Sequence, residues 1–274
     1  MARKISTREL GLILGARLLK SDDLHYGYWS DGLEVTLANL PKAQAAYCDF
    51  LLGKIPPGVR TILDVGCGTG HVSQLLAQRG YAVEAVSPAP LLTERARARL
   101  GDTVPIHPCT LEALDIPRRF DLLLFSESFQ YIPPEQSLPK AHRLLNPGGH
   151  VLLADFFDRE GTGESALRGG HPLQAFQRYL AGQPFRVVLD EDITDRTAPN
   201  LKMVDDWLHD YAVPVWETLE YYLRESHPWL VRLTRPLVGK RLAKLRFKYF
   251  SGQRNAETFA RHKSYRCMCL QRIP

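Results

Sequence analysis

The chain has 274 residues, of which 45% are apolar and 24% charged, so it suits one large globular domain, or one domain with an insertion, that needs no disulfide or metal to hold it. Five cysteines at scattered spacings argue against a disulfide framework and favour a reducing, cytoplasmic location. The net charge of +5 is uneven: residues 224–274 carry thirteen Lys or Arg against two Glu, which predicts an anionic partner for this end.

Membrane insertion and secretion are not indicated. No apolar run approaches the ~20 residues of a membrane-spanning helix. The first 20 residues are basic, but their apolar stretch is short and interrupted by Arg17, and no small-residue cleavage pattern follows. We therefore expect an amphipathic helix there and not a signal peptide.

The N-terminal part, residues 1–58, is predicted to be a helical cap. Apolar residues recur three and four positions apart in 5–20 and in 36–54, as in amphipathic helices. Between the two lies "DLHYGYWSDG" (23–32), a loop rich in aromatic and turn residues.

The middle part, residues 59–157, alternates apolar runs with helical patterns. Alternation of this kind predicts a parallel sheet that helices cover on both faces. The expected strands are 61–66, 81–87, 104–109, 119–128 and 150–157, and the expected helices are 71–80, 91–101 and 134–149.

After residue 157 the alternation stops. A glycine-rich loop (158–172) precedes an expected strand at 185–194, a helical and aromatic stretch at 200–250, and a late strand at 263–272. We interpret residues 158–274 as lid helices, inserted after the fifth strand, together with the last strands of the same sheet.

The segment "DVGCGTG" is the strongest motif. Gly66, Gly68 and Gly70 alternate between a strand and a helix, where they permit tight turns and close approach of a ligand to backbone N–H groups. A dinucleotide site would place its third glycine at position 71, where this chain has histidine. The spacing therefore disfavours a nicotinamide-dependent reductase.

Three segments, "ILDVGCGTG", "CTLEALDIPRRFDLLLFSES" and "LLNPGGHVLLADFF", give the chain its likeness to a known family. Over residues 60–157 it resembles the class I S-adenosylmethionine-dependent methyltransferases. The resemblance implies an α/β fold, a doubly wound and mostly parallel seven-stranded Rossmann-like sheet, and S-adenosylmethionine as the cofactor.

The resemblance also implies which residues hold the cofactor. The glycine loop contacts its amino-acid part, Asp64 fixes the loop or the amine, residues 110–112 hold the adenine, and Tyr26 of "HYGYW" lies over the cofactor. The full set is Tyr26, Asp64, Gly66, Cys67, Gly68, Gly70, Ser87, Thr110, Leu111, Glu112 and Ser126.

Ser87 departs from the family pattern, which has an acid at the end of the second strand to bind the ribose. A hydroxyl is a weaker acceptor than a carboxylate. The cofactor is then bound less tightly, or Glu84, Glu94 or backbone groups substitute. The alternative is that Ser87 and Pro88 only form a turn.

Three residues are candidates for catalysis. Glu127 stands at the carboxyl end of the fourth strand, where open parallel sheets bind ligands, with an N-cap ion pair as the alternative role. His171 in the glycine-rich loop is the candidate base, or else it caps a turn. Tyr131 is a candidate for shielding the sulfonium, together with Tyr26, Tyr28 and Trp29, and core packing is the alternative for these aromatics. Asp155, at the end of the fifth strand, is a weaker candidate.

Other features point to partners or away from them. Residues 229–250 combine apolar and basic side chains at helical spacing, as in a helix that lies on an anionic membrane, binds an anionic lipophilic substrate, or serves as an ordinary lid helix. No nucleic-acid-binding motif is found. We expect no metal: His25, His107 and His142 are interpreted as structural, and the thiols of "CMC" (267–269) as packed.

The predicted function is transfer of a methyl group to a small hydrophobic acceptor, such as a specialised metabolite or an isoprenoid-like lipid. Two alternatives stay open: a cyclase or isomerase that binds S-adenosylmethionine on the same fold without methylating, and a membrane-surface binding module. The sequence does not indicate an oligomeric state.

Overall fold

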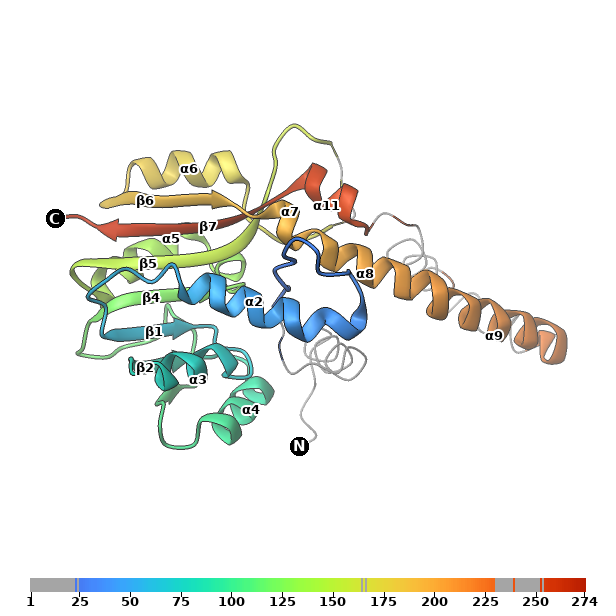
Figure 1. Ribbon diagram of the computed structural model, residues 1–274, viewed down its shortest axis with the longest axis horizontal. Coiled ribbons are helices and arrows are strands. Elements are labelled where there is room, and N and C mark those ends of the chain that lie inside the picture. The colour runs from blue at the N-terminus through green and yellow to red at the C-terminus, as the bar shows by residue number, and fades with distance from the viewer. Residues whose placement is uncertain are drawn as a thin grey trace.

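The structure is a computed structural model and describes residues 23, 25–163, 165, 167–229, 239, 252 and 254–274. Its centre is a seven-stranded sheet in the order β3-β2-β1-β4-β5-β7-β6 (Figure 1). The predicted helix 5–20 and nearly all of the basic segment 229–250 lie outside the described residues.

Five strands of the sheet run parallel, and all of them except the partly buried edge strand β3 are largely buried on both faces. Such strands are nearly continuous in apolar residues, which is why the sequence pattern located them. They are β1 (Thr61–Val65), β2 (Ala82–Val86), β3 (Ile106–His107), β4 (Phe120–Ser126) and β5 (Leu145–Asp158).

The last two strands run antiparallel to their neighbours. β7 (Lys263–Arg272) lies between β5 and β6 (Phe185–Asp192), so the chain returns from the edge to fill an inner position. The prediction of a mostly parallel seven-stranded sheet is confirmed: β7 alone runs opposite to the other six strands.

Helices cover both faces of the sheet. Alternate residues of β1 belong to opposite cores: Ile62 lies with side chains of α2, α3 and α4, and Leu63 with those of α5 and α6. The helices are α2 (Leu40–Leu52), α3 (His71–Gln78), α4 (Pro90–Leu100), α5 (Pro134–Leu144) and α6 (Leu173–Ala181).

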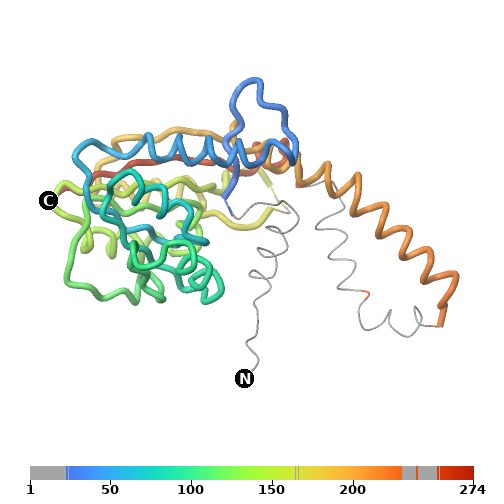
Figure 2. The backbone as a smooth tube through the Cα atoms, turned by 60° about the horizontal axis from the view of Figure 1, so that its bottom comes forward, coloured from blue at the N-terminus to red at the C-terminus, as the bar shows by residue number. Residues whose placement is uncertain are grey.

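Most of the helices after β5 lie between β6 and β7, in the region where the sequence predicted a helical stretch between its last two strands. One helix that the sequence did not predict, α6, follows β5 directly. Of the helices between β6 and β7, α8, η3 and α9 form an arm that leads away from the sheet (Figures 1 and 2). The remaining elements are η1 (Leu37–Asn39), η2 (Phe129–Tyr131), α7 (Thr194–Thr197), α8 (Pro199–Trp207), η3 (Leu208–Ala212), α9 (Val213–Ser226) and α11 (Ala256–His262).

None of the helices in the described part of the chain combines the length and the apolar character that crossing a bilayer requires. The longest element of the arm, α9, carries Glu217, Arg224 and Glu225 among its exposed residues.

Candidate active site

The glycine loop after β1 has the backbone conformation that only glycine adopts without strain. Gly66, Gly68 and Gly70 have φ angles of 80°, 57° and 84°. A Cβ atom at Gly66 would lie 2.5 Å from the Cβ of Ser128, which follows β4. The loop is therefore pressed against the end of the neighbouring strand, and Gly70 directly precedes α3.

A cavity of about 550 Å³ opens beside this loop, at the carboxyl ends of β1, β2 and β4. Its volume is within the range of small-molecule and cofactor sites. Eleven of the fourteen predicted site residues line it: Asp64, Gly66, Cys67, Gly68, Ser87, Thr110, Leu111, Glu112, Ser126, Glu127 and Tyr131.

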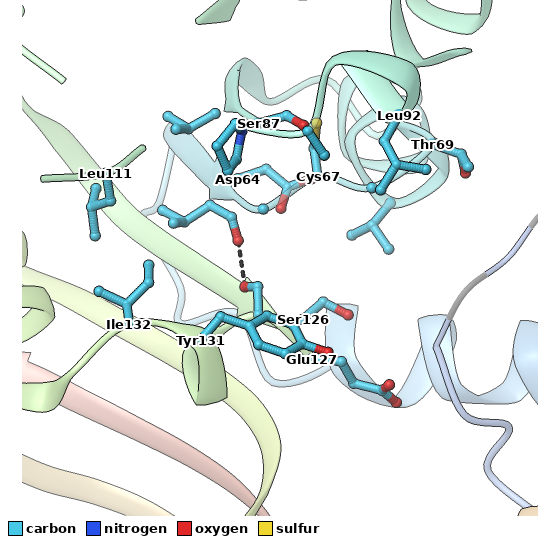
Figure 3. A pocket seen from close by; sticks show the side chains of 18 of the residues that line it. Asp64, Cys67, Thr69, Ser87, Leu92, Leu111, Ser126, Glu127, Tyr131 and Ile132 are labelled. Atoms are coloured by element: carbon cyan, nitrogen blue, oxygen red, sulfur yellow. Dashed lines mark hydrogen bonds between the residues drawn. The ribbon is translucent and has the colours of Figure 1, made fainter. Parts of the chain in front are cut away.

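Figure 3 shows how these residues surround the cavity. Asp64, Cys67 and Ser87 lie on one side, and Ser126, Glu127 and Tyr131 on the other. The first group comes from β1, β2 and the glycine loop, and the second from the end of β4 and the turn η2.

Asp64 stabilises the glycine loop through a contact with the helix that follows it. Its side chain is buried, and its Oδ2 accepts a hydrogen bond of 2.5 Å from the Ser73 hydroxyl of α3. Burial raises the pKa of Asp64 to about 6, and the bond from Ser73 partly opposes this rise. The contact joins the end of β1 to the helix that follows the loop.

Ser87 is buried at the end of β2 and lines the cavity, at the position where the family has its acid. Glu84 does not replace that acid. Its carboxylate is held by His107 at 2.7 Å and by Arg118 at 2.5 Å, and it is not part of the cavity wall. Glu94, the other candidate, is exposed on α4 and is not part of the cavity wall either, which leaves Ser87 and backbone groups as the polar partners expected at this end of the cavity.

Glu127 has the most unusual environment. It is the one non-glycine residue of the described chain with a left-handed backbone, with φ at 52°. Such a conformation costs free energy and is found preferentially at functional sites. Its Oε1 accepts bonds from the Tyr26 backbone N–H at 2.6 Å and from the Tyr265 hydroxyl at 2.8 Å.

A chain of hydroxyl groups continues from this carboxylate. The Tyr265 hydroxyl lies 3.2 Å from that of Tyr47, which in turn lies 3.0 Å from the Ser126 hydroxyl at the cavity wall. Burial, and to a lesser degree the nearby Asp155 carboxylate, raise the pKa of Glu127 to about 8. The residue is therefore poised to exchange a proton near neutral pH.

Asp155, the weaker candidate, does not line the cavity. It is fully buried at the end of β5 and accepts bonds from the Gln130 backbone and side chain at 2.9 Å and 3.0 Å. Burial raises the pKa of Asp155 to about 7. Its bonds to Gln130 hold η2 in place beside the cavity. Its carboxylate also contributes to the raised pKa of Glu127.

His171 lies away from the cavity wall. Its Nε2 is 3.1 Å from the Phe129 carbonyl oxygen and 3.0 Å from that of Ile132, so this nitrogen donates its proton to the backbone. The ring also stands edge-on to Phe129. This geometry favours the alternative stated from the sequence, in which the histidine caps a turn, over the role of catalytic base.

Of the four aromatic residues predicted to shield the sulfonium, three do not line the cavity. Tyr28 stacks on Phe50, and Trp29 is buried against Leu40, so both have the core-packing role. Tyr26 sits among Phe156, Phe259 and Tyr265 and does not form the cavity wall.

Tyr131 is different from the other three aromatics because it lines the cavity and is 56% exposed. Sequence reasoning missed several lining residues, among them Asp23, His25, His71, Leu92 and Ile132. The positions of His71, directly after the glycine loop, and of His25, in the "HYGYW" segment, could have signalled a place in the wall. Within the described part of residues 158–274 no residue lines the cavity, so the predicted lid is not seen over it.

The sheet order, the antiparallel β7 and the glycine loop at the end of β1 define a class I S-adenosylmethionine-dependent methyltransferase fold. Residues 63–153 match the family described as the methyltransferase domain (Methyltransf_11). The chain therefore carries a class I methyltransferase domain whose cofactor is S-adenosylmethionine.

Two kinds of curated relative share part of the sequence. The malonyl-acyl-carrier-protein O-methyltransferase of Anoxybacillus flavithermus is 31% identical over 182 residues, which are 64% of this chain and 63% of that protein. The ubiquinone biosynthesis O-methyltransferase of Pseudomonas paraeruginosa is 37% identical over 101 residues, which are 35% of this chain and 44% of that protein. The alignments thus span less than two thirds of either relative.

Solved structures share the fold over nearly the whole chain. The (4+2)-cyclase SpnF has a TM-score of 0.69 at 16% identity, covering 98% of this chain and 96% of its own. A geranyl diphosphate methyltransferase in complex with GPP and sinefungin has a TM-score of 0.62 at 19% identity, covering 96% of this chain and 94% of its own. At these identities the likeness concerns the fold alone.

Proposed function

We propose that this protein transfers the methyl group of S-adenosylmethionine to a small, hydrophobic acceptor. The observation that carries the proposal is the cavity at the ends of β1, β2 and β4, in which the glycine loop faces the strained Glu127. The loop would take the methionine part of the cofactor, and residues 110–112 its adenine. The methyl group would then point toward the end of β4.

The wall around the proposed acceptor site supports a hydrophobic substrate. Near the end of β4, Tyr131 and Ile132 give the cavity wall an apolar part (Figure 3). Named relatives and structural neighbours include enzymes of ubiquinone biosynthesis and a methyltransferase bound to geranyl diphosphate, both of which involve isoprenoid compounds. An acceptor of this kind would bury its apolar part beside Tyr131.

Methyl transfer is a displacement at carbon. The acceptor atom supplies an electron pair to the methyl group, the carbon–sulfur bond breaks, and its electron pair stays on the sulfur, which loses its charge. The reaction therefore needs an in-line arrangement at close range, which binding at fixed sites supplies. An acceptor that carries a proton must also lose it, and we assign this step to the Glu127 carboxylate because it lies at the cavity wall.

Calorimetric titration with S-adenosylhomocysteine and with NADH tests the cofactor. We expect binding of the first and none of the second, and the reverse result would overturn the proposal. Incubation with methyl-labelled S-adenosylmethionine and a panel of phenols, fatty acyl thioesters and prenyl compounds then tests transfer. Labelled product together with S-adenosylhomocysteine is the expected outcome.

A second candidate is an enzyme that binds S-adenosylmethionine without consuming it, such as a cyclase or isomerase. Ser87, in the place of the ribose-binding acid, favours this function, because loss of a strong cofactor contact matters less where the cofactor is not turned over. In this case the titration would show binding, while a productive substrate would rearrange with no label transferred.

A further inference from the structure

Three side chains that typically bind transition metals converge at the edge of the cavity. His25 precedes α2, Cys48 lies on α2, and His71 is the first residue of α3. One ligand atom from each lies within 4.8 Å of the other two. His25 Nε2 is 3.5 Å from Cys48 Sγ. The fold therefore brings together one thiol and two imidazoles from three separate parts of the sequence.

On both rings Nδ1 lies close to an oxygen atom, within hydrogen-bond distance for His25 and within ion-pair distance for His71. His25 Nδ1 lies 2.9 Å from the Tyr26 carbonyl oxygen, and His71 Nδ1 lies 2.5 Å from the Asp23 carboxylate. When Nδ1 donates to such an acceptor, Nε2 keeps its lone pair. Histidines that bind metals in proteins show this pattern, a backbone carbonyl or carboxylate on the second nitrogen.

The kind and spacing of the donors select the metal. One thiolate with two imidazoles suits zinc, whereas magnesium and calcium prefer oxygen ligands. Bonds of ~2.0 Å to nitrogen and ~2.3 Å to sulfur in a tetrahedral site separate neighbouring ligand atoms by about 3.3–3.8 Å. The His25–Cys48 pair already has this separation. The ligand atoms that are farthest apart, at up to 4.8 Å, would reach a separation suited to one zinc ion after side-chain shifts of about 1 Å.

We propose that His25, Cys48 and His71 form a zinc-binding site, with Asp23 holding the His71 ring. Asp23, His25 and His71 line the cavity, so the fourth coordination position would face it and take water or a polar group of a bound ligand. The metal would tie the segment before α2 to α2 and α3. This proposal revises the expectation of no metal and of a purely structural His25, and it rests on no step of methyl transfer.

Metal binding is tested on the full-length chain without a histidine tag. Protein stripped with a chelator is titrated with Zn²⁺ in competition with a chromophoric chelator. We expect one zinc per chain. Cys48→Ser and His71→Ala should weaken binding at least 100-fold, and Asp23→Asn about 10- to 100-fold, as for other groups that orient a metal-bound histidine. Cys109→Ser, which removes a thiol of another part of the fold, is the matched control and should bind as the unmodified protein does.

Cobalt substitution tests the same site without any mutation. Co²⁺ bound by a thiolate gives an intense charge-transfer absorption in the near ultraviolet. We expect this band in the unmodified protein and in Cys109→Ser, and its loss in Cys48→Ser. A chain that takes up no zinc, shows no thiolate band with Co²⁺, or binds zinc equally well after Cys48→Ser and His71→Ala would overturn the proposal. Circular dichroism of each variant separates loss of the site from loss of the fold.

Discussion

The Tyr265 hydroxyl donates a 2.8 Å hydrogen bond to the Glu127 carboxylate across 138 residues of sequence. Tyr265 belongs to β7, the last strand, and Glu127 follows β4. The same carboxylate oxygen accepts the backbone N–H of Tyr26, from the segment before the core. One half-buried acid at the cavity wall thus joins the N-terminal segment, the central sheet and the final strand.

The first prediction concerns the pH dependence of transfer. A base must be deprotonated, and the pKa of Glu127 is raised to about 8 by burial. The rate with an acceptor that loses a proton should therefore rise as pH increases through about 8. Glu127→Gln should lower the rate by about 10²- to 10⁴-fold, the usual contribution of a positioned base, and remove this rise.

Initial rates between roughly pH 6 and pH 10, a range that brackets the raised pKa, measure the effect. Glu135→Gln, which changes an exposed carboxylate on α5, is the control and should keep the profile. If Glu127→Gln retained both the rate and its rise with pH, another group would be the base.

The second prediction concerns stability. Burial raises the pKa of Asp64 to about 6 and that of Asp155 to about 7. Between their ordinary values near 3.8 and these raised values, the folded state binds more protons than the unfolded state. The contribution of these two carboxyls to the free energy of unfolding should therefore be largest below this window and fall as pH rises through it. Asp155→Asn should flatten the part of the fall that ends near pH 7.

Urea denaturation at a series of pH values measures this dependence. Asp121→Asn provides a contrast of opposite sign. Hydrogen bonds from Asn146, from the Arg60 and Thr61 N–H groups and from the Thr61 hydroxyl lower the pKa of Asp121 despite its partial burial, so its contribution is lost as pH falls through the lowered pKa. A variant of Asp155 whose stability followed the same pH curve as the unmodified protein would contradict the prediction.

Local sequence patterns were sufficient for the parallel core. The buried runs of β1 and β4 are nearly continuous in apolar residues, and the glycine loop lies between a strand and a helix, so its place at the sheet edge follows from topology. The late strand at 263–272 was also predicted with its observed bounds. Eleven of the predicted site residues share one cavity for the same reason, because ends of parallel strands meet.

Features that depend on distant pairing were not accessible to these patterns. The insertion of β7 between β5 and β6 is set by pairing with partners far away in the chain, which a local window does not contain. His171 looked like a loop base because its backbone-carbonyl partners at Phe129 and Ile132 are some forty residues away along the chain. The grouping of His25 with Cys48 and His71 likewise exists only in the fold.

The third prediction tests the glycine loop. At Gly66 the added Cβ of Gly66→Ala would lie 2.5 Å from the Ser128 Cβ, and φ is 80°. The loop must move, and affinity for S-adenosylhomocysteine, measured by calorimetry, should fall at least tenfold. Gly80→Ala has a similar backbone strain, with φ at 89°, but its Cβ would meet nothing within 4 Å and it lies outside the cavity. This control should lose about 1 kcal/mol of stability, as expected for a side chain in a left-handed position, and keep its affinity.

The last prediction restores the missing acid. Ser87 lines the cavity at the end of β2, where a carboxylate would face the ribose hydroxyls of a cofactor bound in the family's orientation. A hydrogen bond to a charged group contributes about 1.5–3 kcal/mol, against about 1 kcal/mol for a neutral one. Ser87→Asp should therefore bind S-adenosylhomocysteine roughly tenfold more tightly than the unmodified protein.

Ser87→Asn separates charge from shape, because it places a neutral acceptor of nearly the same size at that point. Its gain should be clearly smaller than that of Ser87→Asp. Because Ser87 is buried, the new carboxyl would lose part of its charge at low pH, so the advantage of Ser87→Asp should shrink as pH is lowered toward the range in which carboxyls protonate. Equal affinities for the two variants at all pH values would show that the ribose does not lie at the end of β2, and the orientation of the cofactor in the cavity would have to be reversed.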